Sequence, residues 1–135
     1  WTLIGTLTTT SGSSQTQALG ATYKELRFVY TGVSSGNSST FRIQITDDGV
    51  TYGSAIVVTP STATAGGSVS GQGSVLSTGV AATTKDVTAF GALAGTSFFS
   101  DVGSEASENG ITHSIKFTPS SGNFDAGSIA IYGLQ

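Results

Sequence analysis

The segment Lys24-Glu25-Leu26-Arg27-Phe28-Val29-Tyr30 alternates, with its large apolar side chains at every second position. Successive side chains of a β-strand point to opposite faces, so this spacing predicts a strand that has Leu26, Phe28 and Tyr30 on one face. A strand of this kind needs a second layer of structure to cover its apolar face.

The same alternation recurs in segments 41–45, 111–117 and 127–134, and we expect the last of these to lie inside the fold. The residues predicted to share a face are Phe41, Ile43 and Ile45 in the first segment, and Ile111, His113, Ile115 and Phe117 in the second. Segment 80–93 contains β-branched residues and an interrupting Gly91, which favour a strand over a helix.

Turn-forming residues separate these segments. Residues 31–39 are polar and predict a hairpin-like connection between the strands on either side. Asn109-Gly110 is the preferred corner of a tight hairpin. Asp47-Asp48-Gly49 predicts a turn, because short carboxylates bond to nearby backbone amides and glycine accepts a positive φ.

The middle of the chain offers less to bury. A β-rich run extends from Tyr52 to Thr59 and is expected to close at Pro60. Residues 61–72 consist mainly of glycine, serine, threonine and alanine, which predicts a long exposed loop or a thin edge strand.

These patterns predict a single domain over residues 1–135. About eight short strands, with turns every 8 to 12 residues, each have one apolar face that a second sheet must cover. The expected fold class is all-β, an antiparallel β-sandwich of jelly-roll-like form.

Composition limits the functions open to this chain. Its 135 residues contain no cysteine, which excludes disulfides, thiolate metal sites and thiol nucleophiles. The net charge is -3, and we expect neither a nucleic-acid partner nor membrane attachment, because both need clustered cations. Membrane insertion is not expected either, since no apolar run approaches the ~20 residues of a membrane helix. The basic residues are scattered: Lys24, Arg27, Arg42, Lys85 and Lys116.

Asp47 and Asp48 are candidate site residues with three interpretations. They form a turn alone, they bind Ca²⁺, or one of them pairs with Asp101 or Asp125 for glycoside hydrolysis. An Asp-Asp-Gly sequence between strands is usually a turn, so we predict the turn and assign no metal site.

Tyr52 completes the best local cluster for sugar binding. An aromatic ring packs against sugar C–H groups, while the oxygens of Asp47 and Asp48 accept hydrogen bonds from sugar hydroxyls. A tyrosine at the start of a strand more often packs at the core or rim, and that alternative stays open beside ligand binding.

His113 is the only histidine, so a Ser-His-Asp mechanism would have to use it. Its apolar neighbours favour an inward or rim position on a strand, and the glycine-flanked nucleophile elbow of such hydrolases is missing.

The glycines at 66, 67, 71 and 73 do not form a phosphate-binding loop, because such a loop needs a lysine and a following helix and this segment has neither. We therefore predict no enzyme activity and no cofactor.

Several segments resemble small β-sandwich proteins of tailed-phage virions and gene transfer agents. The resemblance lies in the opening Trp1 with Ile4-Gly5, in segments 21–29 and 42–52, and in the closing segment 126–134. Such proteins are tail-fibre, head-fibre or head-spike modules. The resemblance implies packing roles for five residues, which are Tyr23, Leu26, Ile129, Ile131 and Tyr132.

A virion location is what this resemblance implies. The expected partners are other virion proteins, copies of the same chain and bacterial surface polysaccharide, and the expected role is assembly on the particle with contact to host-surface glycans. The alternative function is a carbohydrate-binding module or adhesin domain of a larger secreted protein, and an enzyme is the third reading.

Overall fold

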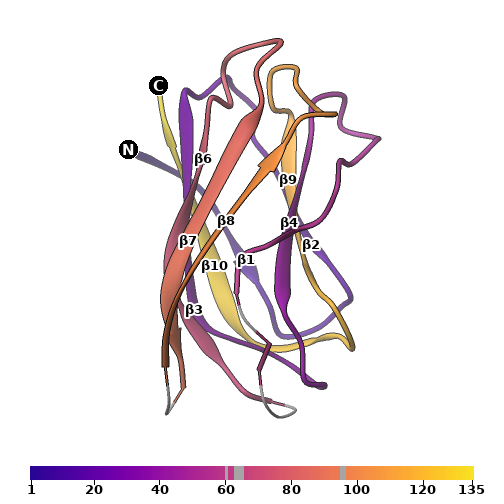
Figure 1. The fold of residues 1–135 in the computed structure, drawn as a ribbon, viewed down its shortest axis with the longest axis vertical. Helices are drawn as coiled ribbons and strands as arrows, with labels where there is room; N and C mark the ends of the chain where they lie inside the picture. Colours follow the sequence, from indigo (N-terminus) through magenta and orange to yellow (C-terminus); the bar gives the residue numbers. More distant parts are fainter. Residues whose placement is uncertain (60, 63–65, 95–96) are drawn as a thin grey trace.

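The protein folds as a two-layered β-sandwich (Figure 1). The computed structural model describes residues 1–59, 61–62, 66–94 and 97–135. Ten strands lie in these ranges, which contain no helix, and every strand pairing is antiparallel. The predicted fold class is therefore confirmed, with two strands more than the sequence indicated. No helix capable of crossing a membrane occurs in the described ranges.

Each layer is one sheet. The larger sheet has the strand order β1 (Thr2–Thr8), β10 (Phe124–Leu134), β3 (Glu25–Ser35), β6 (Val69–Leu76), β7 (Lys85–Leu93) and β8 (Ser97–Glu105). The smaller sheet has the order β2 (Gln15–Ala18), β9 (Ser114–Pro119), β4 (Phe41–Thr46) and β5 (Ile56–Val57). The two chain ends lie side by side, because Thr2 on β1 pairs with Gly133 on β10 (Figure 1).

The connectivity explains the jelly-roll-like form. Along the described strands, the chain changes sheet six times: between β1 and β2, β2 and β3, β3 and β4, β5 and β6, β8 and β9, and β9 and β10. Without β7 and β8, the molecule consists of two four-stranded sheets, β1-β10-β3-β6 and β2-β9-β4-β5, as in an eight-stranded jelly roll. The β7–β8 hairpin widens the first of these sheets (Figure 1).

The core lies between the two sheets and contains the residues that alternation placed there. Phe28 on β3 meets Phe117 on β9 edge to face, with ring centroids 5.3 Å apart. Edge-to-face contact is a favoured geometry for aromatic pairs, so this contact ties one sheet to the other. Ile43 and Ile45 on β4 are fully buried, as the alternation predicted.

The residues of the family resemblance lie largely in this core. Four of them are buried, namely Tyr23, Leu26, Ile129 and Ile131, whereas Tyr132 is half-buried. The packing that the resemblance implies for the first four agrees with their positions.

Strand β6 overturns the prediction for residues 61–72. The described part of this segment includes the start of β6, which lies inside the larger sheet between β3 and β7 instead of forming a loop or an edge. A Cβ on Gly73 would lie 2.2 Å from Cζ of Phe28, and one on Gly71 would lie 3.0 Å from the Tyr30 ring. The glycines are therefore positions where neighbouring rings fill the space of a side chain.

Two predicted hairpins are wrong because their strands lie in different sheets. β3 continues to Ser35 and pairs with β6 and β10, so residues 36–40 cross to β4 in the smaller sheet. Asn109-Gly110 likewise lies between β8 in the larger sheet and β9 in the smaller one. Turn-forming residues indicate a change of direction, but only long-range pairing decides which sheet the next strand joins.

Three further predictions have mixed outcomes. Segment 80–93 contains the strand β7, as predicted. The run from Tyr52 to Thr59 forms a strand only at Ile56–Val57, since it pairs only briefly with β4, and the expected stop at Pro60 lies outside the described residues. In the segment 111–117, β9 begins only at Ser114.

His113 does not take the inward or rim position on a strand that was predicted for it. His113 and Ile111 precede β9 and are exposed, whereas Ile115 and Phe117 are buried. The alternation extends further along the sequence than the strand does, because strand pairing with β2 and β4 starts at Ser114.

Candidate functional site

Asp48 occupies the turn that follows β4. Its Oδ1 accepts hydrogen bonds from the backbone N–H groups of Val50 and Thr51, both at 2.7 Å, and from the Thr46 hydroxyl at 2.9 Å. These bonds stabilise the ionised carboxylate and lower the pKa of Asp48 to about 2. Gly49 has a φ of 77° there, so the predicted Asp-Asp-Gly turn is observed.

Asp47 and Asp48 come together with a third acid that sequence reasoning missed. Carboxylate oxygens of Asp47, Asp48 and Glu108 lie within 4.8 Å of one another. Glu108 belongs to the connection between β8 and β9, so nothing local in the sequence links it to position 47. Its burial, and then the neighbouring negative charges, raise the pKa of Glu108.

The two acids proposed as partners in a carboxylate pair lie in other surroundings. Asp125 at the start of β10 accepts a hydrogen bond from the Ser34 hydroxyl on β3. Asp101 on β8 lies close enough to Tyr30 that its charge adds to burial in raising the pKa of that phenol. The alternative in which Asp47 or Asp48 pairs with Asp101 or Asp125 therefore finds no support among the described residues.

Backbone groups and a buried lysine surround the acid cluster. Asp47 Oδ2 accepts the Gly110 N–H at 2.8 Å, and Asp47 donates its own N–H to Glu108 at 3.3 Å. The fully buried Lys85 donates to the carbonyl of Asn109 in the same connection at 3.2 Å. These bonds give the acids a structural role. These bonds do not test the calcium alternative, because three carboxylates are also ligands of the type that Ca²⁺ takes.

Tyr52 faces β9 instead of the acid cluster. Its hydroxyl lies 3.0 Å from the Ser114 hydroxyl, and Nζ of Lys116 lies 3.9 Å from the centre of its ring. One ring face is therefore covered by a cation, a favourable contact that holds Tyr52 on the smaller sheet. Sugar stacking on the same ring would have to use its other face, and the ligand role of Tyr52 stays a prediction.

His113 borders a depression of about 400 Å³ together with Asp47 and Thr112. Within the described ranges its imidazole has no hydrogen bond to a serine hydroxyl or to a carboxylate. A Cβ added on Gly49 would lie 2.7 Å from Nδ1 of this ring. The glycine therefore makes room for the imidazole beside the turn.

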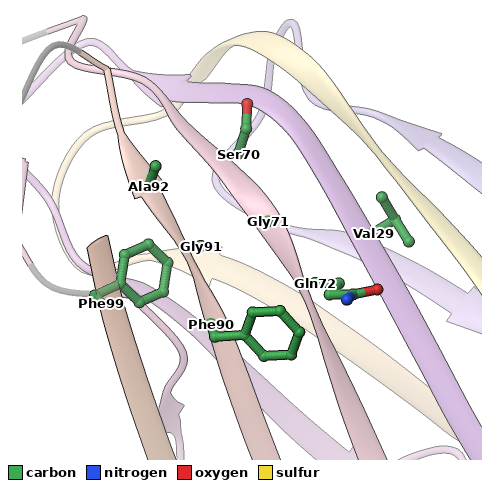
Figure 2. A pocket seen from close by; sticks show the side chains of 8 residues that line it. All are labelled: Val29, Ser70, Gly71, Gln72, Phe90, Gly91, Ala92 and Phe99. Carbon is green, nitrogen blue, oxygen red and sulfur yellow. The ribbon is translucent and has the colours of Figure 1, made fainter. Parts of the chain in front are cut away.

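A larger concave surface lies on the outer face of the larger sheet (Figure 2). It has a volume of about 580 Å³, within the range typical of ligand pockets. We call it the outer groove. Its lining residues are Val29, Ser70, Gly71, Gln72, Phe90, Gly91, Ala92 and Phe99.

The centre of the outer groove is a row across three strands. Val29 on β3 pairs with Gln72 on β6, which pairs with Phe90 on β7. Their neighbours along β3 and β7 are buried inward, so these three side chains point outward. Phe90 is 53% exposed, and its ring extends from β7 toward β6 (Figure 2).

Paired glycines shape the floor of the outer groove. Gly71 on β6 pairs with Gly91 on β7, and a Cβ on either would lie 2.3 Å from a backbone oxygen of the other strand. Two strands can approach this closely only where side chains are missing. On the core side of the sheet, the ring of Phe99 stacks on that of the buried Tyr30 with centroids 6.4 Å apart.

A second depression, of about 260 Å³, continues the outer groove because both are lined by Val29 and Gln72. It adds Trp1, Arg27 and Tyr132 to the same face. The guanidinium of Arg27 lies 4.8 Å from the centre of the Trp1 ring, and Trp1 is half exposed. Arg27 is the charged residue among the residues that line the two depressions.

No known protein family, curated protein or solved structure matches this chain. The resemblance to virion proteins therefore stays a prediction from the sequence. Phe90 lies on the same face of β7 as Thr88, out of phase with the inward Val87 and Ala89. A single apolar residue on a polar face is common on protein surfaces, so the sequence of β7 alone does not indicate the groove.

Proposed function

We propose that this chain is a structural protein of a phage-like virion, a fibre, spike or decoration module, and that its outer groove holds a bacterial surface polysaccharide. The protein acts by binding and assembly, without catalysis. The single observation that carries the binding role is the outer groove, with the exposed ring of Phe90 beside the amide of Gln72.

The chemistry of the outer groove suits a sugar chain. Exposed aromatic rings offer apolar faces to sugar C–H groups, and amide, guanidinium and hydroxyl groups exchange hydrogen bonds with sugar hydroxyls. Phe90 and Trp1 supply rings, while Gln72, Arg27 and Ser70 supply the polar groups. The two adjoining depressions offer an elongated surface, which accommodates a chain better than a single small molecule.

The virion role draws on the jelly-roll-like architecture and on the segments that resemble virion proteins. Both outermost strands of the larger sheet, β1 and β8, have one edge that pairs with no other strand of the described chain. Free edges accept strands of another chain, which provides for contacts with copies of this protein and with other virion proteins.

Polysaccharide binding is tested by titrating the purified protein with capsular or cell-wall polysaccharide fragments and measuring affinity by calorimetry. We expect Phe90→Ala to weaken binding about tenfold, since an aromatic contact contributes about 0.5–1.5 kcal/mol beyond its area. The matched control is Val50→Ala, at an exposed apolar position in the turn after β4. If Phe90→Ala and Val50→Ala bound the polysaccharide with equal affinity, the outer groove would not be the binding site.

The virion role is tested separately, by immunogold electron microscopy of purified particles. We expect labelling at regular positions on the particle, and a label confined to the particle-free fraction would contradict it. The outer groove equally supports the second candidate, a carbohydrate-binding module or adhesin domain of a larger secreted protein. Polysaccharide binding without particle labelling would favour that candidate.

A further inference from the structure

The peptide group between Asn109 and Gly110 is held at both of its polar atoms. Its N–H, on Gly110, donates to Asp47 Oδ2 at 2.8 Å. Its carbonyl oxygen, on Asn109, accepts from Nζ of Lys85 and from the N–H of Thr83, both at 3.2 Å. A carboxylate thus lies at the nitrogen of this peptide group, and a cation and a second donor lie at its oxygen.

This arrangement favours removal of the amide proton. A carboxylate within hydrogen-bond reach of a proton is positioned to act as a general base. The negative charge that then develops on the amide lies largely on its oxygen, where the ammonium of Lys85 and the N–H of Thr83 stabilise it. The burial of Lys85 and its bonds to the carbonyls of Val80 and Thr83 hold the ammonium in place beside this oxygen.

Glycine at position 110 makes the arrangement sterically possible. A Cβ there would lie 2.4 Å from Asp47 Oδ2, so a residue with a side chain would push the carboxylate away. Asn109 is exposed, and within the described part of the chain no hydrogen bond holds its side-chain amide. The side chain is therefore free to turn toward the nitrogen of Gly110.

We infer that Asn109 is a site of spontaneous deamidation, promoted by Asp47 and Lys85. The nitrogen of Gly110 bonds to Cγ of Asn109 as its proton passes to Asp47. The bond from Cγ to Nδ2 of Asn109 breaks. Nδ2 takes up the proton from Asp47 and leaves as ammonia. Water then opens the five-membered imide to aspartate or isoaspartate. Overall, one water is consumed and one ammonia is released.

The product changes the acid cluster. A carboxylate at position 109 adds negative charge next to Asp47, Asp48 and Glu108. An isoaspartate also lengthens the backbone at the carbonyl that Lys85 binds, so the connection between β8 and β9 loses part of its anchoring. The modification therefore acts as a slow, irreversible change at this end of the sandwich.

The reaction is measured on the intact, folded protein during incubation at neutral pH. Peptide mapping by mass spectrometry is expected to find a gain of about one dalton in the fragment that contains Asn109, together with enzymatically detectable isoaspartate. Asn37 and Asn123 are internal controls, because serine and phenylalanine follow them. An unchanged Asn109, or equal gains at the three asparagines, would overturn the inference.

Asp47→Asn separates the chemistry from the fold, because the amide oxygen still accepts the Gly110 N–H but is not a base. We expect deamidation at Asn109 to slow at least about tenfold, since positioned bases contribute about 10²–10⁴-fold. Asp101→Asn, with the same loss of charge on β8, should react at the original rate. An unchanged rate in Asp47→Asn would overturn the role of the carboxylate.

A comparison of folded and urea-unfolded protein covers the case in which Asp47→Asn does not fold. The structure places the promoting groups together only in the folded state, so Asn109 should deamidate faster in the folded protein. A faster reaction in the unfolded chain would show that the fold protects Asn109, which contradicts the inference.

Discussion

Lys85 is a buried cation that holds three backbone carbonyls. It is fully buried, and its Nζ donates to the carbonyls of Val80 at 2.6 Å, Thr83 at 2.8 Å and Asn109 at 3.2 Å. Burial lowers the pKa of Lys85, and the charge of Asp47 opposes this shift. The three carbonyls belong to two connections, so one ammonium joins the segment before β7 to the segment before β9.

Lys85→Met keeps most of the buried volume and removes the three donated bonds. We expect it to lower the free energy of unfolding by about 2–4 kcal/mol, because a buried acceptor left without a partner costs about 1–3 kcal/mol. Urea denaturation followed by tryptophan fluorescence measures this. Lys24→Met is the control, since Lys24 is exposed and its ammonium donates to the Gln135 carbonyl at 3.2 Å. Equal denaturation midpoints for the two variants would show that the carbonyls find other partners.

At the scale of single elements, β6 depends on glycine. Gly73→Ala would place a Cβ 2.2 Å from Cζ of Phe28 and 2.4 Å from the carbonyl oxygen of Thr88. The backbone oxygen cannot move without disturbing the pairing of β6 with β7, so we expect a loss of about 1–3 kcal/mol in stability. Gly36→Ala is the control, because nothing lies within 4 Å of its Cβ position. Thermal unfolding compares the two, and an unshifted transition in Gly73→Ala would contradict this packing.

The elements also separate what local sequence can predict from what it cannot. β3 and β4 could be predicted, because each buries one face and the alternation of Phe28 or Ile43 with polar residues records this directly. β6 could not be predicted, since its glycines leave room for the rings of Phe28 and Tyr30, which lie on a neighbouring strand. Local sequence also predicted the turn at Asp48, because the hydrogen bonds of its carboxylate reach only nearby residues.

At the scale of the whole molecule, the candidate sites depend on which segments the jelly-roll connectivity brings together. Glu108 joins Asp47 because both lie in connections at one end of the sandwich, and the outer groove combines residues from β3, β6, β7 and β8. Sequence reasoning selected Asp47 and Asp48 but missed Glu108 and Phe90. Contacts of this kind follow from long-range strand order, and no local pattern records that order.

The edge of the larger sheet provides a test of self-association. β8 is an outermost strand, and Val102 on it is 76% exposed. A long edge strand with an exposed apolar residue is open to pairing with another chain, and natural proteins block such edges with lysine. We therefore expect Val102→Lys to weaken self-association about tenfold or more, as the loss of roughly 1.5 kcal/mol of valine burial requires. Sedimentation velocity over a concentration series measures this.

Val50→Lys is the control, because Val50 is 81% exposed in a turn that belongs to no strand. If the unchanged protein stays monomeric at all concentrations, the β8 edge does not pair with copies of the chain, and assembly must use other surfaces.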